Sequence, residues 1–300
     1  MNGRLARLFG GLSSTTQGWG GRAGSQLRLR LDLERYRQVY NHLSKEELQR
    51  DSAPLDQGEL FGEMFHRRHR ERRVLGFYTT EGIVHGFERY GLMELLRNRG
   101  FDPVVDIDTT DPVEHRLTIR DPEWGVLVEL LAGRERLDIP GAPEAELLSI
   151  NWLLMQDPSR SFPSGRAPLP NQEHPGLGLF THFGYLLGLT AKRIGCEGLV
   201  NRPSLYHNGH LYGRRSSFVD PLAQGRLRAL ERDLAYLSLS QASRAVSEGQ
   251  VVAADGSRFE WSPSPQVLAL TPRVRRWFES EEYRGAAREV LETERFRLVV

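Results

Sequence analysis

The chain has 300 residues, of which 39% are apolar and 26% are charged, and its formal net charge is +1. This length fits one large domain or two small ones, and the apolar fraction suffices for a hydrophobic core. The charge balance excludes a general attraction to nucleic acid or to an anionic membrane. Only Lys45 and Lys192 of the 40 basic residues are lysines, and this arginine-rich composition indicates a bacterial, GC-rich genome.

The expected location of the protein is the cytoplasm. Cys196 is the only cysteine, so the sequence offers no internal disulfide and a reducing compartment is favoured. No window approaches the roughly 18 consecutive apolar residues of a membrane-spanning helix, so no membrane partner is expected. Residues 1–31 contain five arginines and no acidic residue, which fits a basic tail or an organelle transit peptide. We favour the tail, because the arginine excess continues through the chain.

Residues 1–26 are expected to be a disordered basic tail, followed by a helical N-terminal region over residues 27–110. Apolar spacing predicts helices over residues 33–43, 57–73 and 84–97, and Ser44 with Glu47 forms a capping-box pattern. The arginine-rich stretch 66–73 is a candidate contact surface for a protein partner. It lacks the interleaved aromatic residues of a nucleic-acid surface, so nucleic acid is not expected as a partner.

Residues 111–222 form the predicted core, where the apolar period changes to that of strands. Strands are expected over residues 115–121, 126–131 and 147–155. A loop with five prolines then leads to a helix, a strand, a second helix and an edge strand, over residues 178–194, 198–201, 204–214 and 216–221. The predicted fold class is α+β, with a mixed, largely antiparallel sheet in the order β-β-β-α-β-α-β.

The last region, residues 223–300, is expected to be an appendage of helices and a hairpin. The helices are predicted over residues 224–246 and 274–292. The hairpin is predicted over residues 249–261, with its turn at Asp255-Gly256, and a terminal strand over residues 296–300.

Gly176 and Gly178 precede the long core helix and are a candidate ligand site. The N-terminus of a helix offers free backbone N–H groups and a favourable dipole to an anion such as pyrophosphate. Glycine lets the backbone approach a ligand closely, since it has no Cβ. A Gly-x-Gly after proline is also an ordinary hinge between a loop and a helix, so both interpretations stay open.

With this order of elements, residues 115–221 resemble the GNAT superfamily of acyl-CoA N-acyltransferases. The segments that carry the resemblance are the strand 147–155, Pro175-Gly-Leu-Gly178, the strand 199–201, and Tyr206-His-Asn-Gly-His-Leu-Tyr212 followed by Arg-Arg-Ser-Ser-Phe218. The resemblance implies acetyl-CoA or another acyl-CoA as cofactor. It places the coenzyme A pyrophosphate on the segment that comprises Gln172, Gly176, Leu177, Gly178 and Leu179.

The resemblance also implies a general acid, Tyr212, which would protonate the leaving thiolate. Glu129 and His174 are candidate general bases. The candidates for substrate contact are Trp152, His207, Asn208 and His210. Glu173 stands three residues before Gly176, where the family usually has Gln or Arg.

The predicted function is transfer of an acyl group from acyl-CoA to an amine of an unknown acceptor. The alternative is a non-catalytic protein with a GNAT-like core that acts as a protein-interaction or regulatory module. A third hypothesis is a metal enzyme, because Glu63, His66 and His69, and also His207 and His210, have helical spacing that suits zinc or iron. Arginines surround or follow both sets and would repel a cation, so no metal site is expected.

Overall fold

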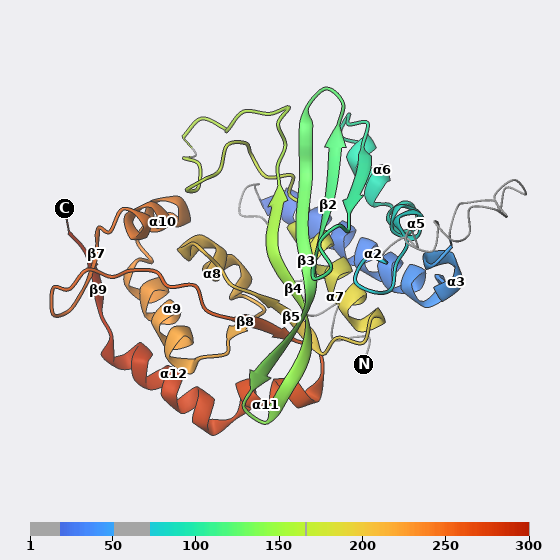
Figure 1. Ribbon diagram of the computed structural model, residues 1–300. Coiled ribbons are helices and arrows are strands. Elements are labelled where there is room, and N and C mark those ends of the chain that lie inside the picture. Colours follow the sequence, from blue (N-terminus) through green and yellow to red (C-terminus); the bar gives the residue numbers. More distant parts are fainter. Residues whose placement is uncertain (1–18, 51–72, 166, 300) are drawn as a thin grey trace, which may run out of the picture. The chain divides into compact units, whose positions relative to one another are not determined.

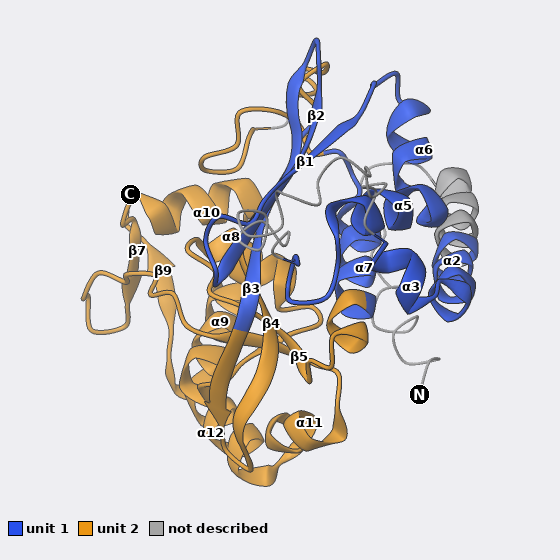
Figure 2. Ribbon diagram, turned by 45° about the vertical axis from the view of Figure 1, so that its right-hand side comes forward, with its two compact units in different colours: residues 1–134, 152–156, 177–189 blue, residues 135–151, 157–176, 190–300 orange. Residues whose placement is uncertain are grey.

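The computed structural model in Figure 1 describes residues 19–50, 73–165 and 167–299, with side chains from residue 31 onward. The chain forms two compact units, which Figure 2 shows in different colours. The first unit holds the described residues up to 134 together with residues 152–156 and 177–189, and the second holds residues 135–151, 157–176 and those from 190 onward. In the described ranges, no helix combines the length and the apolar character needed to cross a bilayer.

The fold class is α+β, and the main sheet is mixed and mostly antiparallel, as the sequence predicts. Its seven strands lie in the order β1-β2-β3-β4-β5-β8-β6. The bounds of these strands are β1 Val104–Asp108, β2 Glu114–Asp121, β3 Gly125–Ile139, β4 Ala142–Met155, β5 Gly198–Asn201, β6 Ser217–Phe218 and β8 Gln266–Ala269.

The parallel pair of the sheet is β4 with β5, in which Leu147, Leu148 and Ser149 lie opposite residues 198–200. Strands β1–β2, β2–β3, β5–β8 and β6–β8 pair antiparallel. A parallel pair needs a crossover connection, and here α7 (Phe180–Arg193) lies in the chain between β4 and β5.

The first unit contains α2 (Trp19–His42), α3 (Lys45–Leu48), α5 (Thr80–Tyr90) and α6 (Leu92–Arg97). The predicted capping box is confirmed, because the Glu47 N–H donates to Ser44 Oγ at 3.1 Å and the Ser44 N–H donates to Glu47 Oε2 at 2.7 Å.

Three predictions for the N-terminal region need comment. Helix α2 begins at Trp19, so the expected disorder does not hold for residues 19–26, and residues 1–18 lie outside the described residues. The predicted helix 57–73, with most of its arginine-rich stretch, lies outside them too. The predicted helix 84–97 is two helices, because Gly91 ends α5 in the left-handed conformation at φ 75°.

Two strands of the main sheet, β1 and β8, are not among the predicted strands. Strand β1 pairs with β2 from Val104 opposite Arg120 to Asp108 opposite Arg116. Strand β8 lies between β5 and β6, about 65 residues further along the chain than β5. The region 223–300 is therefore more than an appendage, since it supplies a strand to the interior of the sheet.

The second unit contains α8 (Tyr206–Tyr212), α9 (Pro221–Asp233), α10 (Leu239–Ser247), α11 (Pro272–Glu279) and α12 (Glu281–Thr293). The predicted helices 224–246 and 274–292 are each divided in two, because Ser238 and Ser280 accept N-cap hydrogen bonds and begin new helices. The predicted hairpin is found around its turn at Asp255-Gly256, where Val252 forms an antiparallel bridge with Arg258. The first arm of this hairpin, β7 (Val251–Ala253), also pairs with β9 (Phe296–Leu298), which lies in the predicted terminal strand.

Two clusters of buried side chains lie in the second unit. One gathers around α9 and includes Tyr206, Phe218, Leu227, Leu230 and Val246. The other gathers around β4, β5, β8 and α11 and includes Leu147, Val200, Val267, Val274 and Trp277. Burial of each large aliphatic side chain stabilises the fold by about 1.5–3 kcal/mol.

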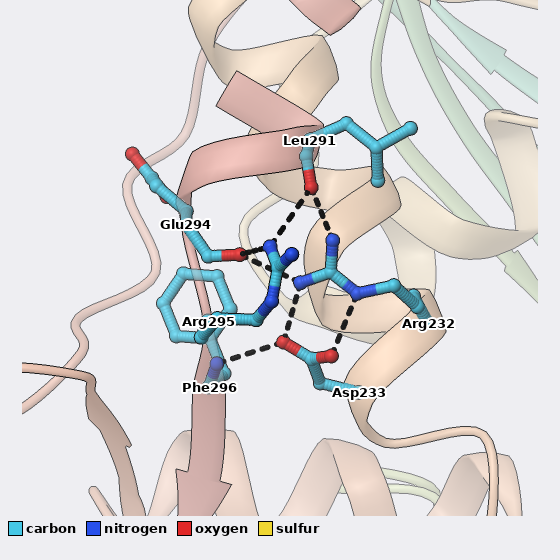
Figure 3. A network of polar contacts seen from close by, with 6 residues as sticks. All are labelled: Arg232, Asp233, Leu291, Glu294, Arg295 and Phe296. Atoms are coloured by element: carbon cyan, nitrogen blue, oxygen red, sulfur yellow. Dashed lines mark hydrogen bonds and ion pairs between the residues drawn. The ribbon is translucent and has the colours of Figure 1, made fainter. Parts of the chain in front are cut away.

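A polar network joins the end of α9 to the end of α12 (Figure 3). The Arg232 guanidinium binds the Asp233 carboxylate through two N–H groups at 2.7 Å and donates to the carbonyls of Leu291 and Glu294. Asp233 Oδ2 also accepts from the Phe296 N–H at 2.8 Å, where β9 begins. The network satisfies the last carbonyls of α12 and fixes the start of the C-terminal strand.

Helices α9 and α12 approach closely at Gly225, and this contact gives a first prediction. A Cβ at Gly225 would lie 2.4 Å from the Ala287 carbonyl oxygen and 2.7 Å from Val290 Cβ. We expect Gly225→Ala to lower the free energy of unfolding by about 1–3 kcal/mol in urea denaturation, because the helices must move apart.

The matched control is Gly285→Ala on α12, where an added Cβ meets nothing within 4 Å. This change should leave stability unchanged or raise it by up to about 1 kcal/mol through helix propensity. Equal effects of the two substitutions would contradict the close approach of α9 and α12.

Candidate functional site

The glycine segment before α7 has alternating exposure. Leu177 and Leu179 are buried, whereas Gly176 and Gly178 are exposed. Gly178 has φ 68°, a left-handed conformation that favours glycine, and an added Cβ there would meet nothing within 4 Å. The two leucines anchor the segment and leave the backbone at Gly178 open to an approaching group.

The electrostatics at the start of α7 suit an anion. The first turn of α7 has no acidic residue, and the first N–H groups of a helix have no partner inside it. Arg99, just after α6, donates a hydrogen bond from its guanidinium to the Leu177 carbonyl. Arg99 could not be predicted as part of this segment, since it is 78 positions from Leu177 and no local pattern connects the two residues.

The first turn of α7 is held against α2. His182 Nδ1 lies 2.9 Å from the hydroxyl of Tyr36, which is buried. Burial raises the pKa of Tyr36, so this phenol stays protonated, and whether it donates to His182 Nδ1 or accepts from it depends on the tautomer of the imidazole. His182 therefore orients the helix, and its Nδ1 is occupied.

Gln172 closes a turn in the Pro-rich loop of the second unit. The Gln172 N–H donates to the Leu169 carbonyl at 3.0 Å, and Gln172 Oε1 accepts from the Leu169 N–H at 3.1 Å. Pro170 and Asn171, with φ 61° at Asn171, occupy the central positions of a type II turn. The acceptor end of Gln172, predicted to bind cofactor, is thus used within the loop.

Glu173 and His174 follow this turn. Glu173 is exposed and His174 is half-buried. Neither side chain has a hydrogen bond or ion pair with another residue that the structure describes.

Tyr212, the predicted general acid, is the last residue of α8 in the second unit. Burial raises the pKa of Tyr212 above its ordinary value, so its phenol is neutral throughout the physiological pH range. A neutral phenol is the form that can donate a proton, and the raised pKa makes Tyr212 a weaker acid than a solvent-exposed tyrosine.

The other predicted residues of α8 have different surroundings. His207 is buried, and its Nδ1 lies 2.7 Å from Ser243 Oγ on α10, which gives it a structural role. A substrate contact by His207 would require this bond to open. Asn208 is half-buried, and its N–H caps the turn by donating to the Leu205 carbonyl at 3.0 Å.

His210 forms a dyad with a carboxylate of α9. Its Nδ1 lies 2.8 Å from Glu231 Oε1, and Arg228 Nη1 lies 2.6 Å from Glu231 Oε2. Burial alone would raise the pKa of Glu231, but His210 and Arg228 lower it below its ordinary value. The ionised carboxylate can only accept, so His210 Nδ1 carries the proton in this contact.

Two predicted residues of the first unit, Glu129 and Trp152, lie on strands of the main sheet. Glu129 on β3 forms an ion pair with Arg116 on β2. Trp152 on β4 is 49% exposed, which is high for a large aromatic side chain. Trp152 is therefore accessible to a ligand, whereas Glu129 already has a partner.

The metal hypothesis gains no support in the described part of the chain. No group of three His, Cys, Asp or Glu side chains there could hold a metal ion. Glu63, His66 and His69 lie outside the described residues. His207 and His210 share α8 but bond to Ser243 and Glu231 respectively.

The predicted residues thus fall into two sets. The first unit contains Glu129, Trp152, Leu177, Gly178 and Leu179, and the second contains Gln172, His174, Gly176, His207, Asn208, His210 and Tyr212. Comparison of the chain with protein-family models, with curated proteins and with solved structures finds no match. The assignment of function therefore depends on the geometry of each set.

The buried pair His207–Ser243 predicts a pH-dependent stability. Burial lowers the pKa of His207, so the unfolded chain binds a proton there that the folded chain does not. The free energy of unfolding should fall as the pH drops through about 6.5, the ordinary pKa of histidine. Urea denaturation should show that the free energy of unfolding falls less between about pH 7.5 and about pH 5.5 in His207→Gln than in the unmodified protein. An equal loss in both proteins would contradict the burial of a neutral imidazole.

Proposed function

We propose that the protein is an N-acyltransferase that moves an acyl group from acyl-CoA to an amine. Part of the order of elements supports this proposal, since the chain runs β2, β3, β4, α7, β5, α8, β6 and β4 is parallel to β5, with β1 added before β2 and β8 placed between β5 and β6 in the sheet. This is the order on which the resemblance to the GNAT superfamily rests. The glycine segment comes before α7, and the tyrosine ends α8.

The observation that carries the proposal is the exposed, left-handed Gly178, two residues before the start of α7. Its backbone is open where the dipole and N–H groups of a 14-residue helix favour a negative charge. The Arg99 guanidinium at the Leu177 carbonyl adds positive charge to the same segment. These features suit the pyrophosphate of coenzyme A, which carries negative charge at neutral pH.

In the proposed reaction the amine nitrogen attacks the thioester carbonyl carbon, and the carbon–sulfur bond breaks. The proton lost by the amine goes to a general base, and the thiolate takes a proton from Tyr212. We assign the base to His174 and not to Glu129, because Glu129 is paired with Arg116. His174 stands two residues before Gly176 and has no hydrogen bond within the described part of the chain. The products are an amide and free coenzyme A.

The non-catalytic alternative is favoured by a different observation. The side chains of Glu129, Gln172 and His207, all predicted for the site, have partners within their own unit. A protein that keeps a GNAT-like core for protein interaction would allow such internal contacts. The two functions differ in whether the chain binds acyl-CoA.

Binding of acetyl-CoA tests the proposal directly. Millimolar acetyl-CoA should raise the melting temperature by several degrees, because it binds only the folded chain. Gly178→Ala should weaken this binding at least about tenfold in calorimetry, since the Cβ occupies the open approach.

The control for Gly178 is Gly256→Ala, because Gly256 also has a positive φ, 87°, and open space at its Cβ position. Its backbone strain is similar, but it lies in the turn after β7. Absence of any shift with the unmodified chain would favour the non-catalytic alternative.

Tyr212→Phe tests the general acid. The phenol hydrogen is lost, so kcat should fall by about 100-fold or more while the affinity for acetyl-CoA stays the same. Steady-state kinetics with a panel of amines, together with calorimetry, measure the two effects. Tyr236→Phe is the matched control, because Tyr236 is 69% exposed. Unchanged turnover in Tyr212→Phe would remove this residue from the mechanism.

A further inference from the structure

A groove of about 360 Å³ lies in the second unit, between the Pro-rich loop and the end of α10. The loop side of the groove is formed by Pro168, Leu169 and Pro170, which are half-buried, together with the exposed Glu173. The helix side carries Arg244 and Glu248, which are also exposed. None of these residues has a role in the reaction proposed above.

Hydrogen bonds hold the loop side of the groove in place. The reciprocal hydrogen bonds between Leu169 and Gln172 close the turn that carries Pro170. Ser240 Oγ on α10 donates to the Pro168 carbonyl at 2.6 Å, and the Asp157 N–H donates to the Pro175 carbonyl at 2.7 Å where the loop closes. The loop is therefore tied both to the helix and to itself, and a ligand meets a preformed wall.

The charges of the groove favour a cation. The C-terminal end of α10, at Ser247, carries the negative end of the helix dipole. Glu173 and Glu248 each bear a carboxylate, and Arg244 bears one positive charge, so the lining has a net charge of −1. One Glu248 oxygen accepts from Gln250 Nε2 at 2.9 Å. Glu173 has no such contact within the described part of the chain.

The loop side of the groove suits an alkyl chain. Pro168, Leu169 and Pro170 present apolar surface there, and the two prolines have no backbone N–H donor. An aliphatic stem could lie along them while its charged end meets the carboxylates. A neutral apolar ligand would gain no attraction from the carboxylates, and an anion would be repelled by them.

We infer that this groove binds a small primary alkylamine as its ammonium ion. Glu173 and Glu248 hold the ammonium group, and the segment Pro168–Leu169–Pro170 contacts the alkyl chain. Glu173 is three residues before Gly176, so the Cα atoms of these two residues are at most about 11 Å apart. The role of this amine as the acyl acceptor rests on the proposed function, whereas its binding does not.

The test uses n-pentylamine as probe and the full chain, by calorimetry and by amide chemical shifts at low ionic strength. Pentylamine should bind and should shift the amide signals of Ser247 and Glu248, whereas pentan-1-ol should not. Glu173→Gln and Glu248→Gln should each weaken binding about two- to fivefold. Arg244→Gln should strengthen binding by a similar factor, because it removes a competing positive charge. Glu279→Gln, an exposed carboxylate on α11, should have no effect.

Only charge recognition in the groove predicts that Arg244→Gln raises the affinity for pentylamine while Glu173→Gln lowers it. Equal weakening in both variants, or equal binding of pentan-1-ol, would overturn the inference. Binding of a lysine-containing peptide but not of pentylamine would overturn the assignment to a small amine.

Parallel titrations with acetyl-CoA separate this inference from the proposed function. If pentylamine binds and acetyl-CoA does not, amine binding in the groove is supported and the acyltransferase proposal is contradicted. If acetyl-CoA binds and pentylamine does not, the acyltransferase proposal is supported and amine binding in the groove is contradicted.

Discussion

The parallel pairing of β4 with β5 is the constraint from which the functional interpretation follows. Parallel neighbours need a crossover connection, and here that connection contains α7, whose N-terminus follows the glycine segment. The pairing leaves no room for a side chain at the start of β5. A Cβ at Gly198 would lie 2.6 Å from the Leu268 carbonyl oxygen and 3.2 Å from Leu147 Cδ2. One glycine thus allows three strands to meet where the parallel and antiparallel parts of the sheet join.

The sequence predicts those elements whose signals are local. Strand β5 and the capping box at Ser44 depend on residues within a few positions of one another, and both are found as expected. Strand β8 has four residues between proline-rich segments, and its partner β5 is distant in sequence, so no periodicity marks it. The divisions at Gly91 and Ser238 depend on a left-handed glycine and on an N-cap, and a smooth apolar period obscures both.

The candidate site shows the same limit. The residue types at Gly178 and Tyr212 indicate their chemistry, and the open backbone at Gly178 and the neutral phenol of Tyr212 agree with what those types allow. The partners of other candidates come from tertiary contacts that no spacing reveals, such as Arg116 for Glu129 and Ser243 for His207. Glu173 is the clearest case. As a neighbour of pyrophosphate its charge is unfavourable, but as a wall of the groove at α10 the same charge attracts an amine.

We propose that the backbone at the start of α7 binds the pyrophosphate of acyl-CoA. Amide hydrogen exchange tests it at the residues concerned. With saturating coenzyme A, we predict slower exchange at the amides of Gly178 and Leu179, because each N–H that contacts the ligand loses access to water. Unchanged exchange at these two amides at millimolar coenzyme A would contradict this binding mode.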